Sequence, residues 1–260
     1  MKRAVILILI SLLIIYFNQE LLFLNPMADT VIENVVYAAK DSQENLLVLD
    51  GSGGRLLKVD SSGTVQWTLE SGRDGFSEAK RVVSAENGHV FIQDIEKEGT
   101  GYRICKERIL EYSDEGKLIG EAVVHEYETA ILAPHIIGMV PTEDGVFYVY
   151  KQDNALEQYK QNGELVKSYA LPDAKQFVSS IAYDKEQEQL YYSNYRGEVY
   201  QYVNGTDDKL LYAAATAEEW SIPKEISISP EHMLYISDIG LRDILKIDPE
   251  GKIERLEEDI

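Results

Sequence analysis

Charged and amide side chains recur in the short polar loops that separate paired apolar runs along the chain. Groups of this kind can bind a ligand through hydrogen bonds and ion pairs, but none of them is an activated nucleophile. They can equally brace neighbouring strands, and Arg55 and Arg242 are the strongest candidates for that structural role. The nine candidate ligand-binding residues are Asp50, Arg55, Asp94, Lys151, Asp153, Asn194, Arg196, Asp238 and Arg242.

No pattern in the sequence predicts catalysis, a metal site or a cofactor. The four histidines, His89, His125, His135 and His232, show neither HExxH nor HxH spacing, although His125 and His135 bracket a segment that could supply ligands. Aspartates such as Asp60 and Asp248 precede turn glycines without the alternating carboxylates of a calcium loop, so turn capping explains them. We therefore expect no catalytic residues, no bound metal and no cofactor.

The net charge and the cysteine content exclude a nucleic-acid partner and an internal disulfide from the prediction. The formal net charge is −20, and the field of a polyphosphate would repel such a protein, so nucleic acid is not an expected partner. Cys105 is the sole cysteine, so no internal disulfide can form. A protein, peptide or glycan ligand is compatible with this composition.

The N-terminus has the pattern of a membrane anchor. Lys2 and Arg3 precede an apolar run over 4–17, apolarity resumes over 21–24, and no small-x-small cleavage site follows. The combined segment is long enough to cross a bilayer, and its positive start favours a cytoplasmic N-terminus. We expect residues 1–24 to be a signal anchor or transmembrane helix, 25–33 a linker, and 34–260 an extracytoplasmic domain. A cleaved signal peptide is the alternative.

The outer part of the chain repeats one phrase five times. Each copy contains an apolar run, a polar turn, a second apolar run and a turn that ends in glycine. Glycine at that point allows the positive φ angle of a tight hairpin. The closing glycines, spaced at 42 to 53 residues, are Gly63, Gly116, Gly163, Gly205 and Gly251.

Each phrase is flanked by two further short apolar runs, which makes four expected strands per unit. Before the first phrase the run is 34–39, and after it 64–69; the other copies have equivalents. Four short strands at a fixed period describe a β-propeller blade, whose two faces are buried by its neighbours. The fold class predicted is all-β: a propeller of about five four-stranded blades after an N-terminal transmembrane helix.

The fifth copy resembles an NHL-type propeller repeat. The resemblance rests on Ile222, Pro223, Ile226, Ile228, Leu234, Ile236, Asp238, Arg242, Ile244, Lys246, Ile247, Asp248 and Gly251. The first copy matches the second half of the pattern through Asp50, Arg55, Leu56, Lys58, Val59, Asp60 and Gly63. The other copies keep only the strand pattern. This resemblance implies a propeller without a particular ligand.

NHL-like propellers have six blades, and five are counted here. The five units are therefore either a closed ring or an incomplete six-bladed ring, and the resemblance inclines the prediction to the second. The order of anchor and propeller resembles the ectodomain of a membrane-bound bacterial signalling protein. We expect a non-catalytic ligand-sensing or protein-interaction module; the alternative is a lactonase-like hydrolase, which needs a divalent metal in the channel.

Overall fold

The computed structural model describes fifteen stretches of the chain, between Ile32 and Arg255. They are residues 32, 34–51, 53–85, 87–99, 101–132, 136–142, 145–150, 155–160, 164–171, 178–203, 207–213, 221–229, 231–238, 240–241 and 243–255. All of the regular elements in these stretches are β-strands. The predicted anchor over 1–24 lies outside them, as does the predicted linker except for Ile32. No helix among the described residues is long and apolar enough to span a bilayer.

The strands form five four-stranded antiparallel sheets, each made of four consecutive strands paired with their neighbours in the chain. The first sheet contains β1 (Val35–Lys40), β2 (Leu46–Asp50), β3 (Arg55–Val59) and β4 (Val65–Glu70). The second contains β5 (Ala79–Ser84), β6 (Val90–Lys97), β7 (Ile104–Tyr112) and β8 (Leu118–Ile131). The third contains β9 (Ile136–Thr142), β10 (Gly145–Tyr150), β11 (Ala155–Tyr159) and β12 (Leu165–Ala170).

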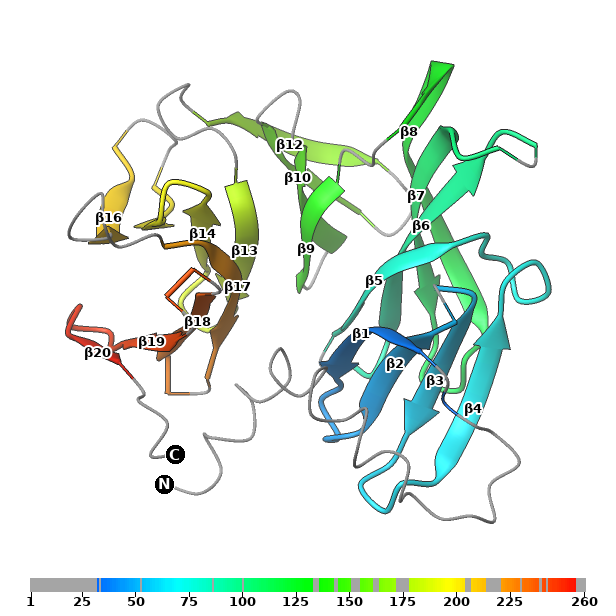
Figure 1. Ribbon diagram of the computed structural model, residues 1–260, viewed down its shortest axis with the longest axis horizontal. Coiled ribbons are helices and arrows are strands. Elements are labelled where there is room, and N and C mark those ends of the chain that lie inside the picture. The colour runs from blue at the N-terminus through cyan, green and yellow to red at the C-terminus, as the bar shows by residue number, and fades with distance from the viewer. Residues whose placement is uncertain are drawn as a thin grey trace.

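The fourth sheet contains β13 (Val178–Asp184), β14 (Gln189–Asn194), β15 (Glu198–Gln201) and β16 (Lys209–Ala213). The fifth contains β17 (Pro223–Ile228), β18 (Leu234–Asp238), β19 (Asp243–Ile247) and β20 (Ile253–Arg255). Figure 1 shows the sheets arranged around a common centre, with the first strand of each nearest to it and the fourth at the periphery. The prediction of an all-β, propeller-like fold with four strands per repeat is confirmed.

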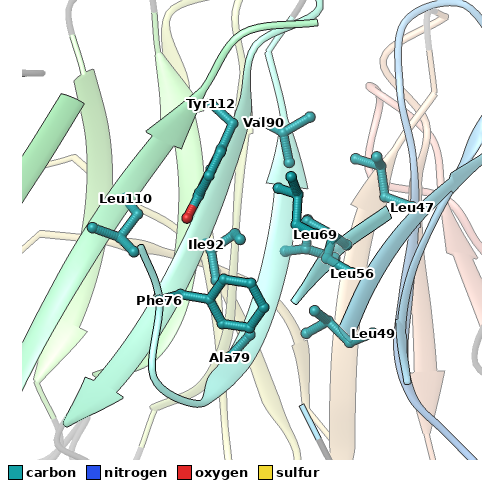
Figure 2. Close-up of a cluster of buried hydrophobic side chains, with 11 residues drawn as sticks. Leu47, Leu49, Leu56, Leu69, Phe76, Ala79, Val90, Ile92, Leu110 and Tyr112 are labelled. Atoms are coloured by element: carbon teal, nitrogen blue, oxygen red, sulfur yellow. The ribbon is translucent and has the colours of Figure 1, made fainter. Parts of the chain in front are cut away.

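Hydrophobic clusters join each sheet to the next one. Between the first two sheets, Leu49 and Leu56 pack against Phe76 and Ile92, as Figure 2 shows. Three similar clusters join the second sheet to the third, the third to the fourth and the fourth to the fifth. Burial of these apolar surfaces, which alternate along each strand, is the main stabilising contribution.

Both faces of the first sheet are buried. Leu47 and Leu49 are fully inaccessible, but they face the second sheet, so their burial does not report on ring closure. Val48 and Leu57 alternate with them on the opposite face, and these are 2 % and 0 % exposed. The first sheet therefore leaves no large apolar side chain of its two central strands open to water.

The predicted glycine turns are present where the structure describes them. Gly63, Gly116 and Gly251 have φ angles of +85°, +78° and +89° in the turns between third and fourth strands. The Oδ1 atoms of Asp60 and Asp248 accept backbone hydrogen bonds in two of these turns, which is the capping role expected of them. Gly163 and Gly205 lie outside the described residues.

A buried ammonium group ties the first sheet to the second. Lys58 is 1 % exposed, and its Nζ lies 2.9 Å from the carboxylate of Asp41 in the β1–β2 turn. The same Nζ contacts the carboxylate of Asp114 in the β7–β8 turn, whose carbonyl accepts a hydrogen bond from Trp67 Nε1 at 2.8 Å. One cation thus satisfies carboxylates from two sheets.

Candidate functional site

The first strand of each sheet has a bulge-like register shift at an equivalent position. In four of the five sheets, the pairing between the first and second strands shifts by one residue near the start of the first strand. The shift comes immediately before the third residue of that strand. In the third sheet the irregularity is opposite residues 148–150, and it places Gly138 at that position. Such bulges re-aim side chains and are common beside functional sites. We call the five equivalent residues the central layer: Tyr37, Arg81, Gly138, Ser180 and Glu225.

Tyr37 and Arg81 contact each other within this layer. The Arg81 guanidinium carbon lies 5.8 Å from the centre of the Tyr37 ring, in cation–π geometry, and the positive charge of Arg81 acts on the Tyr37 hydroxyl. Both side chains are partly buried. The first and second sheets thus present an aromatic hydroxyl and a guanidinium at one point of the ring.

Glu225, from the fifth sheet, acts electrostatically on Tyr37. Burial raises the pKa of Tyr37, and the negative charge of Glu225 raises it further, while Arg81 lowers it in part. The phenol is therefore neutral throughout the physiological pH range and retains its proton for donation. Tyr37 and Glu225 are 188 positions apart in the sequence, yet Glu225 is near enough for its charge to act on the phenol.

The remaining two members of the layer fasten neighbouring inner strands. The hydroxyl oxygen of Ser180 accepts a hydrogen bond from the backbone amide of Ile226, 3.2 Å away in the next sheet. A Cβ atom on Gly138 would stand 2.8 Å from Cγ1 of Ile181, so glycine permits close approach of β9 and β13. The aromatic and charged side chains of the layer are those of the other three positions, Tyr37, Arg81 and Glu225.

Four of the predicted site residues occupy another equivalent position, on the second strand opposite the first residue of the first strand. Asp50, Asp94, Asn194 and Asp238 are between 0 % and 1 % exposed. Each aspartate accepts backbone amides from the segment entering the first strand of its own sheet: Asn34 for Asp50, Ser77 and Glu78 for Asp94, and Ile222 for Asp238. These contacts support the bracing interpretation for the three aspartates.

Both carboxylate oxygens of Asp94 accept hydrogen bonds. Its Oδ2 atom accepts a hydrogen bond from Arg108 Nε at 2.8 Å, and Oδ1 accepts the amides of Ser77 and Glu78 at 2.8 and 2.7 Å. Burial nevertheless raises the pKa of Asp94, because the guanidinium and the two amides offset only part of the lost solvation. These contacts give the Asp94 carboxylate a structural role.

The predicted basic residues are placed differently. Arg55 pairs with the carboxylate of Asp50 across β2 and β3, which is the bracing role considered for it. Arg196 is exposed in the β14–β15 turn, where its backbone amide donates to Asn194 Oδ1 at 3.0 Å. Lys151, Asp153 and Arg242 lie outside the described residues. The six candidates that the structure describes belong to four different sheets and do not gather at one point.

The histidines in the described stretches contact nearby acidic or aromatic side chains. His89 Nδ1 lies 2.6 Å from Glu111 Oε1, and His232 Nδ1 lies 2.6 Å from Asp184 Oδ2 in the neighbouring sheet. His125 packs on Tyr127 with 4.3 Å between ring centres. Within the described residues, no three His, Cys, Asp or Glu side chains gather as metal ligands would.

Sequence reasoning did not select the central layer. The innermost runs were recognised as strands, and Arg81 and Glu225 stand at the start of two of them. Their equivalence depends on a bulge in each inner strand, which displaces the register by one residue without leaving a turn signal. Aligning the sequences of the five innermost strands with one another could have revealed that these residues are equivalent.

Comparisons with known proteins identify the fold. No protein-family model matches the sequence, and no curated protein matches it significantly. Virginiamycin B lyase from Staphylococcus aureus superposes with a TM-score of 0.59 at 12 % identity, over 86 % of this chain and 69 % of that one. A chain of the nidogen/laminin complex gives 0.59 at 12 % identity, over 87 % of this chain and 80 % of its own.

The extracellular domain of BT4673, a proposed one-component system from B. thetaiotaomicron, gives a TM-score of 0.54 at 15 % identity. That match covers 86 % of this chain and 28 % of the other. At such identities the likeness concerns the fold and carries no ligand or activity with it. The chain has the fold of β-propeller proteins.

Proposed function

We propose that this protein is a membrane-anchored, extracytoplasmic β-propeller that senses a ligand or binds a protein, and that it does not catalyse a reaction. The positive start and apolar run of residues 1–24 support the anchor. The likeness to the extracellular domain of BT4673 supports the placement of such a fold outside the cell. We also propose that the repeats are of the NHL type, which the motif residues of the first and fifth copies support.

The observation that carries the proposal is the polar character of the central layer. Adjacent sheets are joined mainly by apolar clusters, because a partly buried polar or charged group costs free energy unless it is paired, as Lys58 is with Asp41 and Asp114. Tyr37 and Arg81 nevertheless contact each other on the inner strands of the first two sheets, and the charge of Glu225, on the inner strand of the fifth sheet, acts on Tyr37. A polar centre surrounded by an apolar framework is a typical arrangement for ligand recognition.

We further propose that the ring has five blades and closes between the first and fifth sheets. Two observations support closure: the effect of Glu225 on Tyr37, and the burial of Val48 and Leu57 on the face that points away from the second sheet. An incomplete six-bladed ring, the inclination of the sequence, would leave that apolar face uncovered.

The experiment that tests the proposed function first locates the protein in the cell and then measures ligand binding. The full chain with a C-terminal tag is expressed in bacteria, and we expect the tag in the membrane fraction and open to external protease. N-terminal sequencing should find the apolar segment retained. Detergent-solubilised protein is then screened by thermal shift against saccharides, peptides and organic acids, and at least one class should raise the melting temperature.

Two results would contradict the proposal. A soluble mature protein that begins near Asp29 would remove the anchor. Turnover of a lactone panel, abolished by chelator and restored by a divalent metal, would favour the alternative of a lactonase-like hydrolase. A catalytically inactive protein that binds a ligand in the membrane fraction is the expected result.

A further inference from the structure

Arg81 stands out among the arginines of this acidic protein. Arg55, Arg73 and Arg108 each form an ion pair with a carboxylate within 4.0 Å. Arg81 is partly buried, and in the part of the chain that the structure describes it has no carboxylate within that distance. In a chain with 45 Asp and Glu residues, a half-buried guanidinium without an ion pair leaves most of its donors free for an anion.

The partner of Arg81 within the layer is neutral. The Tyr37 ring lies beside the guanidinium, 5.8 Å from ring centre to guanidinium carbon, and a neutral phenol does not cancel the positive charge of Arg81. Because burial and Glu225 raise the pKa of Tyr37, its hydroxyl keeps a proton that it can donate to an acceptor beside Arg81. A planar cation next to a hydroxyl donor matches the two oxygens of a carboxylate.

Glu225 limits the charge that the layer can accept. Its carboxylate acts on the Tyr37 hydroxyl, so a second negative charge on a ligand would experience repulsion at the same point. A neutral or cationic group at the other end of the ligand would experience none. The electrostatics of the layer therefore favour an acid with a single negative charge.

We propose that Arg81 and Tyr37 bind the carboxylate of a small organic acid at the central layer, and that Glu225 restricts the site to ligands with one carboxylate. This inference deepens the proposed sensing function and rests on it. A carboxylate of this kind can come from an acidic sugar or from the C-terminus of a short peptide. Both sources share the chemistry that the layer recognises.

The test uses the full chain in detergent and measures binding by isothermal calorimetry. The probes are galacturonate and alanyl-alanine, with galactose and alanyl-alanine amide as counterparts that lack the carboxylate, and glutarate as a dicarboxylate. The variants are Arg81→Gln and Tyr37→Phe, and the control is Arg103→Gln, because Arg103 is exposed outside the layer. Arg81→Lys and Glu225→Gln complete the set.

We expect one of the two monocarboxylates to bind, and its counterpart without the carboxylate to bind at least about tenfold more weakly. Arg81→Gln should weaken binding by about tenfold or more and Tyr37→Phe by about threefold to tenfold, while Arg103→Gln leaves it unchanged. Arg81→Lys should be intermediate, since the charge remains without the planar fork. Glu225→Gln should admit glutarate.

Circular dichroism without ligand checks that each variant is folded, and if Arg81→Gln is unfolded, Tyr37→Phe and Arg81→Lys decide. Equal binding by wild type, Tyr37→Phe and Arg81→Lys would overturn the inference. So would a membrane-bound wild type that binds neutral saccharides or peptides but neither carboxylate, an outcome that leaves the proposed sensing function standing. Loss of the anchor would contradict the proposed function and leave the carboxylate site intact.

Discussion

The backbone amide of Ala79, the first residue of β5, donates a hydrogen bond to the carbonyl of Gly53 in the turn of the preceding sheet, 3.0 Å away. Gly53 has a φ angle of +82°, and a Cβ atom there would stand 2.0 Å from the Ala79 carbonyl oxygen. The β2–β3 turn is thus pressed against the inner strand of the second sheet. This contact fixes the spacing of two sheets at the end of the ring where Asp50 and Asp94 lie.

Gly53→Ala should be strongly destabilising. The substitution adds a positive-φ penalty of about 1 kcal/mol and forces the turn away from Ala79, so we expect a total loss of at least about 3 kcal/mol. Gly51→Ala is the matched control, since Gly51 has a φ angle of +60° in the same turn with no atom near its added Cβ. It should lose only about 1 kcal/mol in urea unfolding followed by tryptophan fluorescence. Equal losses would show that the turn does not hold the sheets together.

Asp94 offers a test of the bracing role against the ligand-binding role. Asp94→Asn keeps an acceptor for the Ser77 and Glu78 amides, and Arg108 retains Glu121 Oε1 at 3.0 Å, so we expect a loss of about 1–2 kcal/mol. Asp94→Ala strands the buried donors, and its loss should be about 3–5 kcal/mol. Ligand binding should be unaffected in Asp94→Asn. A stable Asp94→Ala variant with lost binding would restore Asp94 to the ligand site.

The sequence was sufficient to predict an all-β, propeller-like fold with four strands per repeat, because short-range patterns determine each repeat. Paired apolar runs and turn glycines such as Gly63 and Gly251 determine strands and hairpins locally, and both glycines have the expected φ angle. The central layer could not be predicted from the sequence in the same way. Tyr37, Arg81 and Glu225 become neighbours only when three sheets are placed around one centre, and Asp94 looks equally suited to a ligand until its buried partners are known.

The buried Lys58 pair predicts a specific response to pH. Burial alone would raise the pKa of Asp41, but hydrogen bonds from Asn45 and Lys58 outweigh it, and the pKa lies below its ordinary value of 3.8. A lowered folded-state pKa contributes stability that is present above the ordinary value and is lost as pH falls through the folded value. Lys58→Met leaves the Asp41 carboxylate buried without its cation and should cost about 3–5 kcal/mol at pH 7.

The difference between wild type and Lys58→Met should shrink at pH 3, because protonation of Asp41 removes the unpaired charge in the variant. Asp114→Asn is the comparison, and it should cost only about 1 kcal/mol at pH 7, since the Asp114 side chain is 37 % exposed and its charge is screened. Urea unfolding at both pH values, followed by the fluorescence of Trp67 beside Asp114, measures each quantity. A difference that is the same at both pH values would contradict the role of the ion pair.

The most direct test of the account is a double-mutant cycle between Tyr37 and Glu225, because the claim that one ring brings the first and fifth sheets to a shared polar centre depends on their proximity. Tyr37→Phe, Glu225→Gln and the double variant are unfolded in urea, with Arg103→Gln in place of Glu225→Gln as the control cycle. We predict a Tyr37–Glu225 coupling of at least about 0.5 kcal/mol, and additivity in the control. Additive effects in both cycles would contradict a closed ring with a common central layer.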